Sequence, residues 1–168
     1  MKTIILFMGL KGSGKTYLGT FTEEKLSIPY LKIENIFLGC MEKYSDLKGV
    51  ELEKKAYQLV LEDISEWMKK HDVISIDSTG TSSVFSDFFS ELKRVYRVIL
   101  VYVAAPSEIC KMRALNRDKK DQIPVSEDFL DLINREAAKI QLKWDIIWDN
   151  SQTKSPDAFI NILSSHFT

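Results

Sequence analysis

The chain has 168 residues, of which 45% are apolar and 28% are charged. This composition is typical of a soluble globular protein and excludes a disordered or low-complexity chain. A formal net charge of -1 excludes a global positive field that would hold a polyanion such as duplex DNA, which favours a small substrate. One hydrophobic core is the default at this length, so we expect a single domain over residues 1–168.

Cysteine and histidine are scarce and scattered. Cys40 and Cys110 lie far apart, and the histidines are His71 and His166, so no structural zinc spacing is present. Such cysteine use favours a reducing compartment, and we predict a cytoplasmic location. The apolar run over residues 4–8 is too short to span a bilayer, so we interpret it as a buried strand and expect no membrane partner.

Short apolar runs alternate along the chain with stretches of helical spacing. The runs predict strands over residues 3–8, 30–33, 73–76, 96–104 and 145–148. Helices are predicted over residues 16–26, 47–70 and 83–94, from Pro106 onward, from Ser126 to about 143, and over 157–166. This alternation predicts an α/β fold with a parallel sheet covered on both faces. The charged stretch 116–122 predicts a mobile loop between two helices.

Residues 9–16, Gly-Leu-Lys-Gly-Ser-Gly-Lys-Thr, fit the phosphate-binding pattern GxxxxGK[ST] (Walker A), directly after a strand and before a helix. Glycine lets the loop wrap a phosphate with its backbone N–H groups pointing inward. Lys15 supplies a cation to the β- and γ-phosphates, Thr16 offers a hydroxyl to Mg²⁺, and the helix N-terminus faces the same anion. The predicted loop residues that bind ATP are Gly9, Lys11, Gly12, Ser13, Gly14, Lys15, Thr16 and Tyr17.

The class of nucleotide-binding protein can be narrowed further. The Asn-Lys-x-Asp motif that reads guanine is absent, because Asn116-Arg117-Asp118 lacks the lysine. Motor and transporter ATPases need a longer chain. Small phosphotransferases therefore remain as the main possibility.

The opening residues through Thr16, together with Asp77-Ser78-Thr79-Gly80 at a strand end, resemble the small P-loop kinases. This family includes polynucleotide 5′-kinases, shikimate kinases and adenylate kinases. The resemblance implies a three-layer sandwich with a five-stranded parallel sheet of order 2-3-1-4-5 and a nucleotide at the carboxyl ends of the strands. It also implies a lid, which we place at about residues 116–125.

The resemblance assigns roles to two carboxylates. Asp77 is expected near Mg²⁺, although an Asp at this position can also cap a turn. Glu34 lies about where shikimate and polynucleotide kinases have an aspartate that meets the acceptor hydroxyl, although a Glu in a first helical turn also compensates the helix dipole. Lys32 stands where shikimate kinases have a further acid, which argues against shikimate as the acceptor.

The resemblance also assigns roles to cations and turn residues, each with a structural alternative. Arg113 and Arg117 share a helix face and resemble an arginine that packs on adenine and one that reaches the phosphates; the alternative is surface solvation. Arg135 would bind an anionic acceptor or form a structural ion pair. Asn150 would border adenine or serve the turn alone, and Thr79 and Gly80 would line the acceptor pocket or a solvated loop.

The sequence therefore predicts a kinase that uses ATP and Mg²⁺ to phosphorylate a hydroxyl or phosphate of a small acceptor. The predicted catalytic residues are Lys15, Glu34, Asp77 and Arg117, with Thr16 and Asp77 as metal ligands and Glu34, Thr79, Gly80 and Arg135 on the acceptor. One alternative is a 5′-hydroxyl kinase for nucleic acid ends, which the pI of about 6.2 disfavours. Another is a nucleotide-binding regulator or degenerate kinase that does not transfer phosphate.

Overall fold

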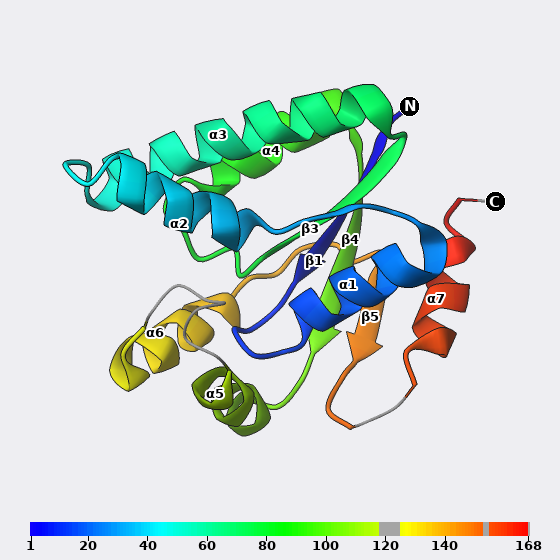
Figure 1. Cartoon of the computed structure of the whole chain (residues 1–168). Helices are drawn as coiled ribbons and strands as arrows, with labels where there is room; N and C mark the ends of the chain where they lie inside the picture. The colour runs from blue at the N-terminus through cyan, green and yellow to red at the C-terminus, as the bar shows by residue number, and fades with distance from the viewer. Residues whose placement is uncertain (118–124, 153–154, 168) are drawn as a thin grey trace.

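The computed structural model describes residues 1–117, 125–152 and 155–167. Their elements run in the order β1 (Thr3–Met8), α1 (Lys15–Leu26), β2 (Tyr30–Leu31), α2 (Ile33–Lys43), α3 (Gly49–Lys70), β3 (Val73–Ser78), α4 (Phe85–Val95), β4 (Arg97–Ala104), α5 (Ser107–Asn116), α6 (Glu127–Ala137), β5 (Ile146–Asp149) and α7 (Asp157–Ser164). Strands and helices alternate through most of the chain, as the apolar pattern predicts (Figure 1).

The strands form one five-stranded sheet in the order β2-β3-β1-β4-β5, and every pairing is parallel. This confirms the expected α/β fold and strand order. β1 is the central strand and pairs along its whole length with β3 and β4. Met8 is level with Ser78 and Tyr102, so the loops that follow these strands leave the same edge of the sheet.

The two faces of the sheet follow from side-chain alternation along β1. Ile4, Leu6 and Met8 face a core completed by α3 and α4. Ile5 and Phe7 face a second core with α1 and α7. Both faces are therefore apolar and covered, which explains why the central strand is a continuous apolar run.

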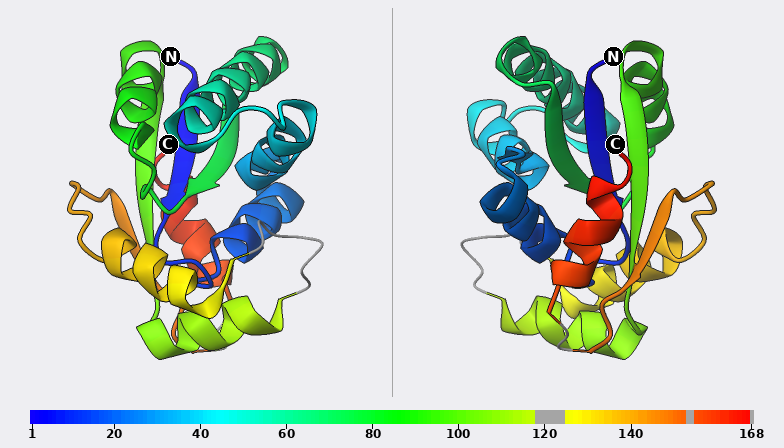
Figure 2. Two further views of the ribbon diagram at one scale, coloured as in Figure 1. Left: turned by 90° about the vertical axis from the view of Figure 1, so that its left-hand side faces the viewer. Right: turned by 90° about the vertical axis from the view of Figure 1, so that its right-hand side faces the viewer.

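Further helices lie near the carboxyl ends of the strands. α5 and α6 lie side by side below the arrowheads of the sheet (Figure 1, Figure 2), and α2 packs against α3. α6 begins at Ser126, whose side chain accepts a hydrogen bond from the Phe129 N–H. These helices, with the loops that follow β1 and β3, surround the edge of the sheet where the resemblance places a nucleotide.

Two segments differ from the sequence-based expectations. The strand predicted over 30–33 is only two residues long, and Ile33 already begins α2, a helix that the sequence analysis did not predict. The helix predicted to reach about 143 ends at Ala137. Beyond it, Ile140, Leu142 and Trp144 pack against the core from an irregular segment that leads to β5.

Residues 118–124 of the predicted lid lie outside the described residues. Within the described ranges, none of the helices combines the length and apolarity needed to cross a bilayer.

Candidate active site

The phosphate-binding loop, residues 9–16, connects β1 to α1 and has a left-handed or related backbone at three glycines. The φ angles are 146° at Gly9, 91° at Gly12 and 102° at Gly14, a region that other residues rarely adopt. A Cβ on Gly9 would lie 2.5 Å from the Val103 carbonyl oxygen. A Cβ on Gly12 would overlap the Cys110 carbonyl, and one on Gly14 would overlap the Asn150 amide. These glycines are therefore needed to fit the loop against β4, α5 and the turn after β5, in addition to leaving room for phosphate.

The side chain of Lys15 turns back toward the first residues of the loop. Its ammonium donates hydrogen bonds to the carbonyls of Gly9 at 3.1 Å and Leu10 at 2.8 Å. Burial lowers the pKa of Lys15, and the nearby Asp77 carboxylate partly opposes this shift. The first turn of α1 contains no acidic residue, so its positive end is not neutralised locally. Cation and helix end together make the loop suited to an anion.

Asn134 of α6 fixes the middle of the loop. Its Oδ1 accepts a 2.7 Å hydrogen bond from the Lys11 backbone N–H, and its Nδ2 donates to the Lys11 carbonyl at 3.2 Å. Nearby, Leu10, Cys110 and Ala137 form a small apolar cluster that joins the loop to α5 and α6. The Lys11 amide is thus engaged by the protein, which leaves phosphate binding to the later amides of the loop.

We expect Asn134→Ala to lower the free energy of unfolding by about 1–3 kcal/mol, because a partly buried backbone donor and acceptor of Lys11 lose their partners. Chemical denaturation of the purified variant measures this change. Asn161→Ala, an exposed asparagine within α7, is the matched control and is expected to stay within about 0.5 kcal/mol. Equal stability of the two variants would show that the Asn134 contacts contribute nothing.

The turn after β5 meets the loop from the other side. Asn150 Nδ2 donates to the Ser13 carbonyl at 2.7 Å, and Arg113 Nη1 donates to the Asn150 carbonyl at 3.0 Å. The structure thus brings together Arg113, Asn150 and the loop. Arg113 and Arg117 do not point the same way, however, because α5 ends at Asn116 and the backbone of Arg117 is extended. Arg117 reaches Glu34 instead.

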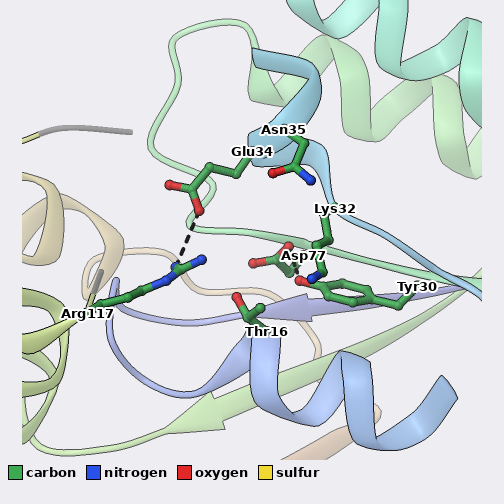
Figure 3. Close-up of a pocket in the computed structure, with 7 residues that line it drawn as sticks. All are labelled: Thr16, Tyr30, Lys32, Glu34, Asn35, Asp77 and Arg117. Carbon is green, nitrogen blue, oxygen red and sulfur yellow. Dashed lines mark hydrogen bonds and ion pairs between the residues drawn. The ribbon is translucent and has the colours of Figure 1, made fainter. Parts of the chain in front are cut away.

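A polar pocket with a volume of about 260 Å³ opens beside the loop (Figure 3). It gathers side chains from α1, β2, the first turn of α2 and the residue before it, the end of β3 and the residue that follows α5. Its lining residues are Thr16, Tyr30, Lys32, Glu34, Asn35, Asp77 and Arg117. The predicted residues Thr16, Glu34, Asp77 and Arg117 are therefore neighbours although they are up to 101 positions apart in the chain.

Glu34 bridges two cations at the mouth of this pocket. Its Oε1 accepts a hydrogen bond from Lys11 Nζ at 3.0 Å, and its Oε2 pairs with Arg117 Nη1 at 3.4 Å. The side chains are partly buried, so both ion pairs are less screened than surface pairs. Glu34 thereby connects α2 to the phosphate-binding loop and to the residue that precedes 118–124.

Asp77 lies at the end of β3 and points into the pocket (Figure 3). Burial raises the pKa of its carboxyl, while the Lys15 ammonium and a hydrogen bond from Tyr30 oppose that shift. The Tyr30 hydroxyl donates to Asp77 Oδ1 at 2.7 Å. Burial, with the Asp77 charge beside it, raises the pKa of Tyr30, so this phenol keeps its proton.

Other predicted site residues lie elsewhere. Tyr17 is 54% exposed and stacks on Phe21, away from the pocket lining. Thr79 pairs with Thr81, and a Cβ on Gly80 would press on Met8 and Ile140. Arg135 is exposed on α6, whereas its neighbour Asn134 turns to the loop. None of Thr79, Gly80 and Arg135 is among the residues that line the described pocket.

Four residues of the site were not predicted: Tyr30, Lys32, Asn35 and Asn134. Tyr30 begins the two-residue strand β2, so it lies next to the carboxyl end of that strand, where a polar residue is the signal that could have identified it. Lys32 and Asn35 flank Glu34, and their inclusion follows from the position of the first turn of α2. Asn134 is a buried amide in an otherwise amphipathic helix, which by itself indicates a polar partner.

These residues fit ATP and Mg²⁺. The loop presents backbone amides, the Lys15 cation and a helix N-terminus to an anion. Thr16 and Asp77 supply one hydroxyl and one buried carboxylate to the same pocket, and Mg²⁺ prefers oxygen ligands, commonly one or two carboxylates plus phosphate oxygens.

A five-stranded sheet in this order, with a glycine-rich loop between β1 and α1, defines a P-loop kinase fold. Solved structures share it at low sequence identity. A shikimate kinase from Bacteroides thetaiotaomicron superposes with a TM-score of 0.66, 16% identity and 98% coverage of both chains. The APS kinase of Mycobacterium tuberculosis gives a TM-score of 0.64 at 15% identity, covering 99% of this chain and 97% of that one.

Sequence similarity narrows the relationship. A cytidylate kinase from Sulfurisphaera tokodaii is 32% identical over 138 residues, which are 80% of this chain and 72% of that protein. No protein-family model matches the chain. The chain belongs to the same family of P-loop kinases as this cytidylate kinase.

Proposed function

We propose that this protein transfers the γ-phosphoryl group of ATP to the phosphate of a nucleoside monophosphate. Cytidine monophosphate is the first acceptor to test, because the relative with 32% identity is a cytidylate kinase. The observation that carries the proposal is the charge pattern of the pocket beside the phosphate-binding loop, where Lys32 and Arg117 face the carboxylates of Glu34 and Asp77.

The charge pattern favours a phosphate acceptor over a hydroxyl. A hydroxyl acceptor benefits from a carboxylate that takes its proton, whereas a phosphate oxygen is already ionised at neutral pH and needs cations around it. Glu34 is held between Lys11 and Arg117, so its oxygens are engaged by donors. Lys32 and Arg117 are suited to binding the acceptor phosphate.

The remaining roles follow from position. Lys15 and the amides of residues 12–16 hold the β- and γ-phosphates, and Arg117 offsets charge on the transferred group. Thr16 and Asp77 would hold Mg²⁺, which would neutralise phosphate charge during transfer. Arg113 and Asn150 border the nucleotide next to Ser13. Most of the rate enhancement then comes from alignment of the two phosphates and from electrostatics.

The proposal is tested by incubating the protein with labelled ATP, Mg²⁺ and single acceptors, and separating the products. The acceptors are cytidine, uridine and adenosine monophosphates, with cytidine, shikimate and a 5′-hydroxyl oligonucleotide as comparison arms. We expect a labelled nucleoside diphosphate and no product from the comparison arms. Transfer only to a hydroxyl would overturn the phosphate assignment, and nucleotide binding without any transfer would support a regulator instead.

Glu34→Gln separates a positioning role from a base role. Because Gln keeps the length of the side chain but weakens both ion pairs, we expect KM for the acceptor to rise several-fold and kcat to stay within about tenfold of wild type. A general base contributes about 10²–10⁴-fold to the rate, so a larger fall in kcat at unchanged KM would contradict the positioning role. Steady-state kinetics at saturating ATP make the comparison, with Glu24→Gln on the exposed part of α1 as the control.

A further inference from the structure

Tyr30 contacts Asp77, one of the two side chains expected to hold the metal. Its hydroxyl donates a 2.7 Å hydrogen bond to Asp77 Oδ1, and Tyr30 and Thr16 line the same pocket. Tyr30 belongs to β2 and Asp77 to β3, so the phenol joins two neighbouring strands beside the pocket that Thr16 of α1 also lines (Figure 3).

The ring of Tyr30 is itself fixed. The residue is only 5% exposed, and its ring lies so close to α1 that a Cβ on Gly19 would be 2.7 Å from it. β2 pairs with β3 through Tyr30 and Leu31, which sets the height of the phenol relative to Asp77. A rigid donor on a buried carboxylate restricts that carboxylate to few orientations, as the orienting partners of metal ligands generally do.

We propose that Tyr30 is a positioning residue of the magnesium site, which holds the Asp77 carboxylate in the arrangement that receives the metal–nucleotide complex. This inference rests on the proposed function. It predicts that the Tyr30 hydroxyl acts on the metal-dependent part of nucleotide affinity and leaves the metal-independent part unchanged. Binding of the phosphates themselves depends on the loop and Lys15, which Tyr30 does not hold.

The test is calorimetric titration of ADP, with Mg²⁺ and with EDTA, into wild type, Tyr30→Phe and Tyr102→Phe. Phe keeps the ring against Gly19 and removes only the hydroxyl. We expect Mg²⁺ to strengthen ADP binding less in Tyr30→Phe than in wild type, by about tenfold, which is the scale of one hydrogen bond to a charged group. Affinity in EDTA is expected to change less than twofold. Tyr102 stacks on Trp144 and does not line the pocket, so Tyr102→Phe should match wild type.

A double-mutant cycle with Asp77→Asn supplies a second measurement. If Tyr30 acts through Asp77, Tyr30→Phe should have little further effect on the metal-dependent gain in the Asp77→Asn background. Thermal unfolding of each variant shows whether it folds, and the cycle compares only folded proteins.

The outcomes separate the two proposals. Failure of wild type to bind ADP in either buffer would overturn the proposed function itself. If wild type gains affinity with Mg²⁺ and Tyr30→Phe gains as much, the positioning role is wrong and the proposed function stands. An equal loss for Tyr30→Phe with and without Mg²⁺ would assign Tyr30 to general packing and would also overturn the inference.

Discussion

Lys15→Met is expected to lower kcat for phosphoryl transfer by about 10²–10³-fold, the scale seen when one preorganised charge-stabilising group is removed from an active site. Met fills a similar volume but cannot place a cation next to the phosphates. Lys15 is 6% exposed and its ammonium meets backbone carbonyls of the loop, so the side chain has no alternative surface role. A coupled assay of ADP release with the accepted nucleotide measures the loss.

The matched control is Lys25→Met on the same helix. Lys25 is exposed near the end of α1, where it lies over the Phe21 ring and 4.0 Å from Asp157. We expect this variant to keep wild-type turnover and stability within about 0.5 kcal/mol. Unchanged transfer in Lys15→Met would overturn the assignment of the phosphate-binding loop. A melting temperature near that of wild type would show that the loss of activity is not a loss of fold.

Gly12→Ala is expected to destabilise the protein by at least about 2 kcal/mol and to weaken ADP binding more than tenfold. The added Cβ would overlap the Cys110 carbonyl, and the φ of 91° is itself strained for alanine. Backbone atoms on both sides leave no flexible side chain to move, so relief requires a shift of the loop or of α5. Thermal unfolding and calorimetry measure the two effects.

The same substitution at Gly39 should raise the stability of the protein rather than lower it. Gly39 lies inside α2, and nothing lies within 4 Å of the position of an added Cβ. Alanine there is expected to raise the free energy of unfolding by about 0.5–1 kcal/mol, because it reduces the conformational entropy of the unfolded chain. If both variants lost stability equally, the packing of the loop against α5 would not be the cause.

Local patterns predicted most of the fold because the central strands are continuous apolar runs and the helices carry one apolar face. They failed where two periods compete. Tyr30, Leu31 and Ile33 suit a strand, yet Ile33, Ile36, Phe37 and Cys40 also suit a helix, and the structure adopts the helix from Ile33. Gly39, which has a low helix propensity, lies within this segment and weakens the helical pattern. At α6, Ile140 continues the helical spacing but belongs to the irregular segment that returns to β5.

The site was predictable where the chain itself carries a motif and not where partners come from tertiary structure. Lys15, Thr16 and Asp77 follow from loop and strand ends. Arg135 illustrates the limit, because one residue of helix turns a side chain by about 100°, and it is Asn134 that meets the loop. The prediction that Arg113 and Arg117 share one helix face required α5 to continue through residue 117, but the helix ends at Asn116.

The packing of the three loop glycines against later parts of the chain affects when the loop can bind a nucleotide. Gly9 packs against Val103, Gly12 against Cys110 and Gly14 against Asn150. The motif lies within the first sixteen residues, but its conformation depends on contacts with the later half of the chain. A newly synthesised N-terminal segment would contain the motif but would lack the contacts that fix the conformation of the loop. Once the later strands and α5 have folded, the loop is already ordered before the nucleotide binds. Nucleotide binding therefore does not pay the entropic cost of ordering the loop.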